Sequence, residues 1–491
     1  MTSIHPLEIP EIITRIGNFL PLWSQERAEG TGRLKLVFDP KTFHTCLLVS
    51  TIWHDTLIPI LWSYYEAEAM EFVPRSTLVR YSILFRTFRQ HHGYGTRALD
   101  SYGCSRVVKA TLNPETIEEL EESRRMVKEN DGRLKELEWN GPTESAPLRV
   151  EDFAGLRTLE RLNMSRWKVD GGRLWRVLEV LAGSLRILEI DWLSVVDKLS
   201  GIDDDGGDVE GVTVILPMLE VYRACGPPYG PDPANFVKQC PNLVRSVLSL
   251  DAGKGYYRDD NKDITRLADS LRTHCPSLRA LTVKGSIPPE QKAILIRNCT
   301  SIPSRSTLLE LVVDVQSMGK DIMDSISAHA QTLETLGILT SSSIDDEATI
   351  MMKHILQISV QCPRLKWFAV HAIYSYESAK SILGGLKAAA WQSSAMEILD
   401  LNAGDPSETW GDGVFKLKDL FANGPILGWY YHPKKKSLSW SDDDVYWSEA
   451  FARELFESIR GLDNLRVLRW CGTDFTRSSY YDRTRDTPLL Y

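Results

Sequence analysis

The stretch Leu134-Lys135-Glu136-Leu137-Glu138-Trp139 carries the pattern that decides the fold of this chain. Two leucines stand three residues apart, and an apolar residue follows two positions later. The alternation of Leu137, Glu138 and Trp139 is typical of a β-strand with one buried face. The same spacing of apolar residues recurs down the chain, and the further copies start at Leu159, Leu185, Leu216, Leu278, Leu308, Leu333, Leu365, Met396 and Leu465.

The copies up to Met396, with a weaker one at Leu243, follow one another at an average of about 29 residues, a period that indicates leucine-rich repeats. The interval from Met396 to Leu465 is roughly two such periods. We therefore expect a degenerate copy near residues 426–431.

The segments between the strands have the spacing of amphipathic helices. Leu174, Val177, Leu178 and Leu181, for example, lie on one helical face. A single strand and helix cannot bury both apolar faces alone, so neighbouring units must stack. We predict an α/β fold, an irregular leucine-rich-repeat solenoid with a parallel sheet on the concave face and helices outside. The second leucines should form one continuous core: Leu137, Leu162, Leu188, Leu281, Leu311, Leu336 and Leu399.

The repeats depart from the strict motif at the eighth position, which is usually Asn or Cys. Pro142 and Trp167 occupy that position in the first two copies, so we expect no asparagine ladder. A Cys-Pro-x-Leu sequence recurs just before strand segments, at Cys240, Cys275 and Cys362. There the proline ends the preceding helix, and the cysteine should act as a small buried residue.

Strand residues between the buried ones should point to the concave face, where a target protein would bind. The residues that we expect to contact the target are Glu138, Glu189, Glu220, Thr282, Asp400 and Arg469. Because Glu138, Glu189 and Glu220 fall in the first four copies, that half should offer a negative strip to a basic partner.

The first sixty residues have a different pattern, that of three helices. Between Pro6 and Leu20, Ile9, Ile12, Ile13 and Ile16 occupy one face of an amphipathic helix. Asp39-Pro40 offers a start for a second helix, and a third segment runs from residue 57 to residue 62. A unit this small buries a modest core and commonly needs a partner.

Residues 7–13 (Leu-Glu-Ile-Pro-Glu-Ile-Ile), the stretch Cys46-x-Leu48-Val49-Ser50-x-x-Trp53 and Pro59-x-Leu61-Trp62 resemble an F-box. The resemblance implies a three-helix module that docks onto a Skp-family adaptor and thereby onto a cullin–RING ubiquitin ligase. Residues 22–41 form an insert where a typical F-box has only a few residues. The positions expected to contact the adaptor are Leu7, Ile9, Pro10, Ile13, Leu48, Val49, Trp53, Pro59 and Trp62.

The two patterns together resemble the F-box/leucine-rich-repeat class of ligase substrate receptors. We expect an F-box-like domain at 1–66, a linker with degenerate repeats at 67–133, a solenoid at 134–472 with a large insertion near 405–447, and a tail at 473–491. The expected function is recruitment of a protein target to the ligase, in the cytoplasm or nucleus. The alternative is a repeat scaffold unconnected with a ligase, whose N-terminal helices only cap the repeats.

Composition and motifs exclude several other classes. The formal charge of −9 argues against nucleic acid and anionic membranes as partners. No apolar run is long enough to span a bilayer, and the N-terminus does not resemble a secretory signal. The eight cysteines include no Cys-x-x-Cys pair, and phosphate-binding, nucleophile-elbow and zinc-peptidase motifs are missing from the sequence. We therefore expect neither an enzyme nor a metal or cofactor.

Overall fold

The computed structural model describes residues 6–20, 22–27, 34–70, 72–90, 104–142, 148–169, 171–191, 194–195, 214–225, 233–250, 262–300, 308–315, 319–339, 354, 357–358, 361–372, 386, 395–403, 415–416, 429–432, 446–447, 449–459, 462–470 and 473–477. The chain forms two compact units, Met1–Pro241 and Asn242–Tyr491, and each is described by itself.

The first unit begins with three helices and a hairpin. A short 3-10 turn, η1 (Pro6–Glu8), leads into α1 (Pro10–Phe19), where Pro10 suits the first helical turn. Antiparallel strands β1 (Trp23–Arg27) and β2 (Leu34–Phe38) form the insert. Helices α2 (Lys41–Leu47) and α3 (Thr51–Leu61) follow. Their shared core contains Ile13, Phe43, Trp53, Leu57 and Leu61.

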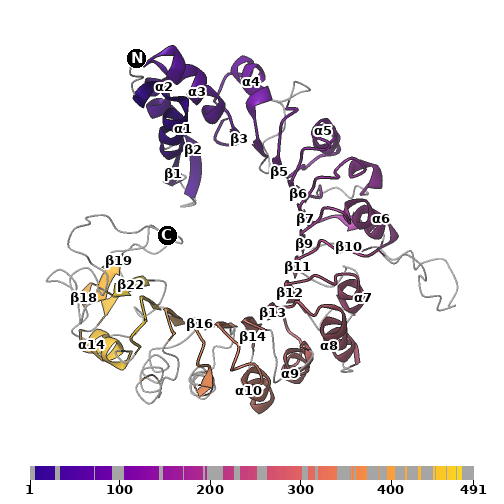
Figure 1. Ribbon diagram of the computed structural model, residues 1–491, viewed down its shortest axis with the longest axis vertical. Helices are drawn as coiled ribbons and strands as arrows, with labels where there is room; N and C mark the ends of the chain where they lie inside the picture. The colour runs from indigo at the N-terminus through magenta and orange to yellow at the C-terminus, as the bar shows by residue number, and fades with distance from the viewer. Residues whose placement is uncertain are drawn as a thin grey trace, which may run out of the picture. The chain divides into compact units, whose positions relative to one another are not determined.

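The rest of the first unit is a parallel sheet with helices on one side. Its strands lie in the order β3 (Tyr64–Glu66), β4 (Thr87–Arg89), β5 (Lys109–Leu112), β6 (Glu136–Asn140), β7 (Arg161–Ser165), β9 (Ile187–Asp191) and β11 (Val221–Cys225). The connections contain α4 (Arg75–Tyr81), η2 (Ser82–Leu84), α5 (Ile117–Glu129), η4 (Val150–Asp152) and α6 (Gly171–Leu181), and α7 (Pro233–Lys238) follows β11. A small parallel pair joins β8 (Lys168–Val169) to β10 (Ser194–Val195). Helices α5 and α6 lie on the same side of their strands (Figure 1).

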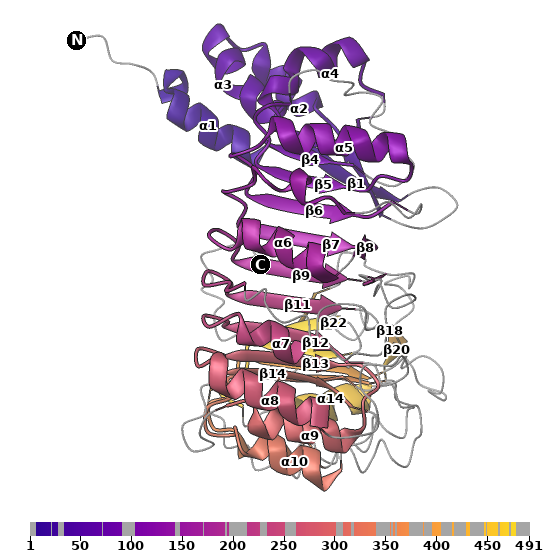
Figure 2. The ribbon, with the colours of Figure 1, turned by 90° about the vertical axis from the view of Figure 1, so that its right-hand side faces the viewer.

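The second unit repeats this plan. Parallel strands run in the order β12 (Arg245–Ser249), β13 (Ala280–Lys284), β14 (Glu310–Asp314), β15 (Thr335–Leu339), β16 (Trp367–Ala372), β17 (Ile398–Ala403) and β21 (Val467–Trp470). The connecting helices are α8 (Lys262–His274), α9 (Pro289–Asn298), α10 (Lys320–Ser327) and α14 (Glu449–Ser458). Helices α8, α9 and α10 stack side by side over one face of the strands (Figure 2).

The core of each unit is a row of apolar side chains that point from the strands toward the helices. Leu137, Leu162, Leu188 and Tyr222 are register partners in the first unit. Leu281, Leu311, Leu336, Phe368, Leu399 and Leu468 are partners in the second. All of these side chains are buried. An α/β fold of leucine-rich-repeat type is therefore confirmed, with the second leucines in the core of the unit to which each belongs.

Two predicted boundaries are wrong. The sheet starts at β3, inside the range assigned to the helical domain. Strands β4 and β5 lie within 67–133, where we expected a linker with degenerate repeats. Strands β3, β4 and β5 carry Tyr65, Phe88 and Ala110 at the second leucine position, so the leucine pattern does not locate them. At the other end, residues 473–477 of the predicted tail form β22 (Thr473–Arg477), which pairs antiparallel with β21.

The predicted degenerate copy near residues 426–431 is also wrong. Strand β17 pairs directly with β21, so no repeat strand lies between them. Residues 429–432 form β19 (Trp429–His432), which pairs antiparallel with β22 at the edge of the sheet. A further antiparallel pair joins β18 (Phe415–Lys416) to β20 (Tyr446–Trp447), and the rest of the 405–447 insertion lies outside the described residues.

A short polar ladder is present in the first unit, although the sequence predicted none. The Asn113 side-chain amide donates to the carbonyl oxygen of Gln90 at 2.7 Å. The Asn140 amide donates to the Asn113 side-chain oxygen, and the Ser165 hydroxyl donates to the Asn140 side-chain oxygen. Asn140 lies six residues after Leu134 rather than eight, which is why the strict motif misses it. The ladder ties the ends of neighbouring strands together.

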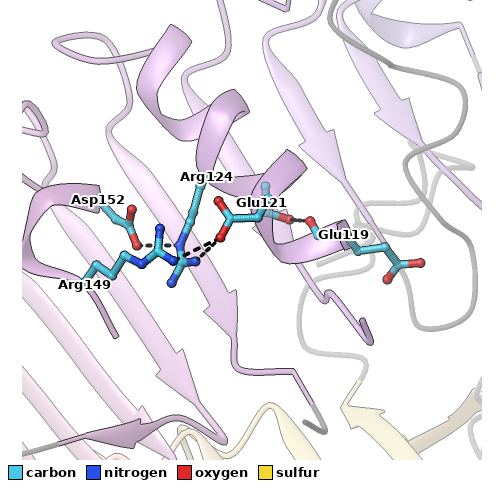
Figure 3. A network of polar contacts seen from close by, with 6 residues as sticks. Glu119, Glu121, Arg124, Arg149 and Asp152 are labelled. Carbon is cyan, nitrogen blue, oxygen red and sulfur yellow. Dashed lines mark hydrogen bonds and ion pairs between the residues drawn. The ribbon is translucent and has the colours of Figure 1, made fainter. Parts of the chain in front are cut away.

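An ionic cluster fastens helix α5 to the next connection, η4 (Figure 3). The buried Arg124 guanidinium donates from Nε to Asp152 Oδ2 at 2.8 Å and from Nη1 to Glu121 Oε1 at 2.7 Å. Arg149 Nη2 lies 3.2 Å from the same Glu121 oxygen. Burial raises the pKa of Asp152 above its usual range, and the Arg124 charge opposes that rise. Arg124, together with Arg149, therefore favours the charged form of this half-buried carboxylate against the effect of burial.

Replacing Leu188 by Ala should lower the free energy of unfolding by about 2–5 kcal/mol, because it opens a cavity in a fully buried row. Ile187→Ala, one residue earlier on the opposite face and only half-buried, should cost clearly less. Urea denaturation of both variants measures the difference. Equal losses would contradict the assignment of the two faces.

Replacing Arg124 by Met should cost about 3 kcal/mol of stability near pH 7, because Asp152 loses its cation. The folded-state pKa of Asp152 then rises further above its unfolded value of about 3.9. An acid with a raised folded pKa stabilises the fold at low pH and loses that contribution as pH rises through the folded pKa. The penalty should therefore shrink as pH falls toward 4. Arg125→Met, an exposed change on the same helix, is the matched control in the unfolding measurements. A penalty that does not vary between pH 4 and pH 7 would rule out this role for Asp152.

Candidate protein-binding surfaces

Two hydrogen bonds organise the start of α3 in the three-helix part. The Ser50 hydroxyl oxygen accepts from the backbone N–H of Trp53 at 3.3 Å, as an N-cap. The Trp53 indole Nε1 donates to the carbonyl oxygen of Leu7 at 2.9 Å. The segment before α1 is thereby fixed against α3.

Only some of the predicted adaptor contacts lie on the surface. Leu48 and Val49, in the turn between α2 and α3, are 74% and 62% exposed. Leu7 is also exposed, and its carbonyl oxygen is bonded to Trp53 of α3. Pro10 and Pro59 are also exposed, and Ile9 is half-buried. Ile52, which the prediction omitted, is exposed near the start of α3. We call Leu7, Leu48, Val49 and Ile52 the α2–α3 patch.

Three predicted adaptor contacts are buried instead. Ile13 has no exposed surface, and Trp53 and Trp62 are also buried. Their physical role is in the interior: Ile13 and Trp53 fill the space between the helices. Trp62 stacks on Tyr81 of α4 with 4.8 Å between ring centroids, and Phe38 at the end of the insert lies 6.2 Å from it. As the protein stands, these side chains are not available to a partner.

The side of each sheet away from the helices is called the helix-free face. In the first unit it carries two rows of register partners. One row contains Glu66, Arg89, Thr111, Glu138, Asn163, Glu189 and Arg223. The other contains Tyr64, Thr87, Lys109, Glu136, Arg161, Ile187 and Val221. This face is therefore rich in charges of both signs.

Most of these charges are paired across neighbouring strands. Glu189 is buried and accepts from Arg161 Nη2 at 3.0 Å and from the Asn163 amide at 3.2 Å, with Arg223 at 3.7 Å. Glu220, just before β11, pairs with Arg186 at 2.5 Å. The predicted negative strip is therefore wrong for Glu189 and Glu220, because arginines on adjacent repeats neutralise both. The predicted copy at Leu216 is also out of register: Tyr222, not Leu219, is the partner of Leu188, so Glu220 lies before the strand and not on it.

A third row lies just before the strands and alternates in sign. Lys135 Nζ lies 2.8 Å from Glu160 Oε1, and Arg186 pairs with Glu220. The hydrogen bond from Lys135 lowers the pKa of Glu160, and the hydrogen bond to Glu220 raises that of Arg186. Exposed pairs of this kind contribute little to stability individually. Positive and negative side chains nevertheless alternate regularly from one of these repeats to the next.

The helix-free face of the second unit is less charged. Thr282 and Val312 are half-buried partners in β13 and β14, and Trp367 in β16 is 41% exposed between Thr335 and Ile398. The predicted target contact Asp400 is buried, at 2% exposure. Arg469 is its register partner on β21, and its side chain lies outside the described part of the structure.

The cysteines of the Cys-Pro-x-Leu sequences are buried, as predicted. Burial raises the pKa of both Cys275 and Cys362 to about 12, so their thiols stay protonated at neutral pH and are poor nucleophiles. Within the described ranges, no group of three His, Cys, Asp or Glu side chains is placed to hold a metal ion. Nor does any described helix have the length and apolar character that crossing a membrane requires.

No protein-family model matches the chain, and a search of curated proteins finds no match. A chain from the crystal structure of the Rad7 and Elc1 complex in yeast is similar at 10% identity and a TM-score of 0.39, over 72% of this chain and 91% of that one. The leucine-rich-repeat ectodomain of the Arabidopsis receptor kinase HAESA, in complex with an IDA peptide hormone, matches at 11% identity and a TM-score of 0.13, over 57% of this chain and 64% of that one. The fold assignment therefore rests on the observed strands and helices.

Replacing Trp53 by Phe should loosen the contact between η1 and α3, because the Leu7 carbonyl loses its donor. The loss should be about 1 kcal/mol, seen as roughly fivefold faster amide hydrogen exchange in α1 and α3. Trp175→Phe on α6 is the control, since no hydrogen bond of its indole N–H is present among the described residues. Unchanged exchange in the Trp53 variant would show that the bond does not hold these elements together.

Proposed function

We propose that this protein is the non-catalytic substrate-recognition subunit of a cullin–RING ubiquitin ligase of the Skp–cullin–F-box type. The three-helix part would dock onto a Skp-family adaptor, and the repeats would hold a protein target. Catalysis would belong to the partners, and the protein would act in the cytoplasm or nucleus.

The observation that carries the proposal is the exposure of the α2–α3 patch. Leu48 and Val49 are large apolar side chains in the Cys-x-Leu-Val-Ser stretch that resembles an F-box, yet they point away from the core. Contiguous exposed apolar residues commonly mark protein–protein contact sites. Ser50 fixes the start of α3 directly after them, so the patch is presented on a rigid support.

The repeats support the second half of the proposal. A parallel sheet whose second face is covered by none of the described helices leaves rows of side chains open to a partner. In the first unit those rows are charged and hydrogen-bonding, a composition suited to a protein surface rather than a lipid one. The identity of the target is not encoded in this pattern.

A second candidate function is a repeat scaffold with no ligase, in which the three helices only cap the sheet. The stacking of Trp62 on Tyr81 favours this alternative, because it joins α3 to the first repeat connection. A cap, however, does not require Leu48 and Val49 to be exposed.

Co-purification with a Skp-family adaptor separates the two candidates. The double variant Leu48→Glu, Val49→Glu should reduce capture of the adaptor at least tenfold, because it places two charges in the centre of the apolar contact. Phe72→Glu with Ile83→Glu changes two exposed apolar residues elsewhere in the first unit and should leave capture unchanged.

Circular dichroism of each variant checks that the fold is retained. Adaptor capture that survives the Leu48 and Val49 changes would remove the α2–α3 patch as the docking site. If the unaltered chain captures no adaptor at all, the scaffold function is favoured.

A further inference from the structure

A pocket of about 160 Å³ opens on the helix-free face of the first unit. Its lining comes from four adjacent strands, β4 to β7, and consists of Arg89, Lys109, Ala110, Thr111, Glu136, Leu137, Glu138, Arg161 and Asn163. Its volume is that of roughly one long side chain, well below the usual range for small-molecule sites. Most of its walls are polar.

The cations of the pocket already have carboxylate partners. Lys109 Nζ lies 2.6 Å from Glu136 Oε2, and Arg161 Nη2 lies 3.0 Å from Glu189 Oε1. Arg89 Nη1 lies 3.8 Å from the buried Glu66. An anionic ligand would have to compete with these carboxylates for each cation.

Glu138 differs from the other carboxylates of this face. It lines the pocket and lies between Thr111 and Asn163 in the strand register. Its Oε2 accepts a hydrogen bond from the Thr111 hydroxyl at 3.3 Å, and no cation of the described residues lies within ion-pair distance. An ionised carboxylate can accept about four hydrogen bonds, so most of its capacity is unused.

We propose that this pocket receives the side chain of a lysine or arginine from a protein target, with Glu138 as its anionic partner. The inference rests on the proposed function, since it names the chemistry of the target that the repeats hold. Arginine fits best, because its planar guanidinium pairs with a carboxylate through two parallel hydrogen bonds. The polar side chains of Thr111 and Asn163 flank Glu138 on the two neighbouring strands.

The test uses the full chain and blocked pentapeptides, acetyl-Gly-Gly-X-Gly-Gly-amide, with Arg, Lys, Gln or Glu at X. Titration calorimetry at low salt should show binding of the Arg and Lys peptides and weaker binding of the Gln and Glu peptides. Glu138→Gln keeps the size of the side chain and removes its charge, so affinity for the Arg peptide should fall about tenfold. Glu179→Gln, on the exposed side of α6, is the matched control and should change nothing.

Arg-peptide affinity that is equal in the unaltered chain and in the Glu138→Gln variant would falsify the proposal. Preferred binding of the Glu peptide, lost in Arg161→Gln, would overturn it in favour of an anion site. Raised salt provides a second measurement, since it should weaken binding of the Arg peptide if the contact is ionic.

The failure of this inference can be separated from failure of the proposed function. The Glu138→Gln variant should capture the Skp-family adaptor as well as the unaltered chain does. If the unaltered chain captures the adaptor but binds no Arg peptide, only the proposal for the pocket fails. If it binds the Arg peptide but captures no adaptor, only the proposed ligase function fails.

Discussion

The fold depends on one constraint, the row of apolar side chains that runs from strand to strand beneath the helices. A single strand and helix of this length cannot bury the apolar face of the strand and that of the helix without help. Each repeat is therefore stable only when an adjacent repeat stacks against it. Leu137, Leu162 and Leu188 meet this condition as direct partners, fully covered from water. The residues on the other face are then free to vary, and it is these that carry charges, pockets and exposed aromatic side chains.

Much of this arrangement could be predicted from the sequence because a buried row imposes a spacing on every repeat. The Leu-x-x-Leu pattern reports the row directly, and it misses strands in which other residues meet the same need. Tyr65, Phe88 and Ala110 fill the row at the start of the sheet, so the pattern assigns β3 to the helical domain and does not locate β4 and β5 within the predicted degenerate repeats. Likewise β22 and β19 run antiparallel at the edge and follow no repeat spacing.

The candidate sites were harder to predict, because they depend on contacts between residues far apart in the sequence. Trp53 belongs to the stretch that resembles an F-box, but its indole is turned inward to the Leu7 carbonyl. Glu189 and Glu138 occupy the same register row, yet arginines on the strands either side cover the first and not the second. The sequence pattern predicts which residues lie in this row, but only the three-dimensional structure shows which of the glutamates in it are paired with arginine.

The alternating charges just before the strands restrict which repeats can be deleted or duplicated without placing like charges next to each other. Lys135, Glu160, Arg186 and Glu220 occupy successive repeats, and each is opposite in sign to the next. Deleting the repeat that contains Glu160 would bring Lys135 against Arg186, two like charges, and duplicating it would set Glu160 against its own copy. Removing two consecutive repeats would keep the alternation. The order of the copies is thus part of the structure, and gain or loss of repeats in pairs disturbs it least.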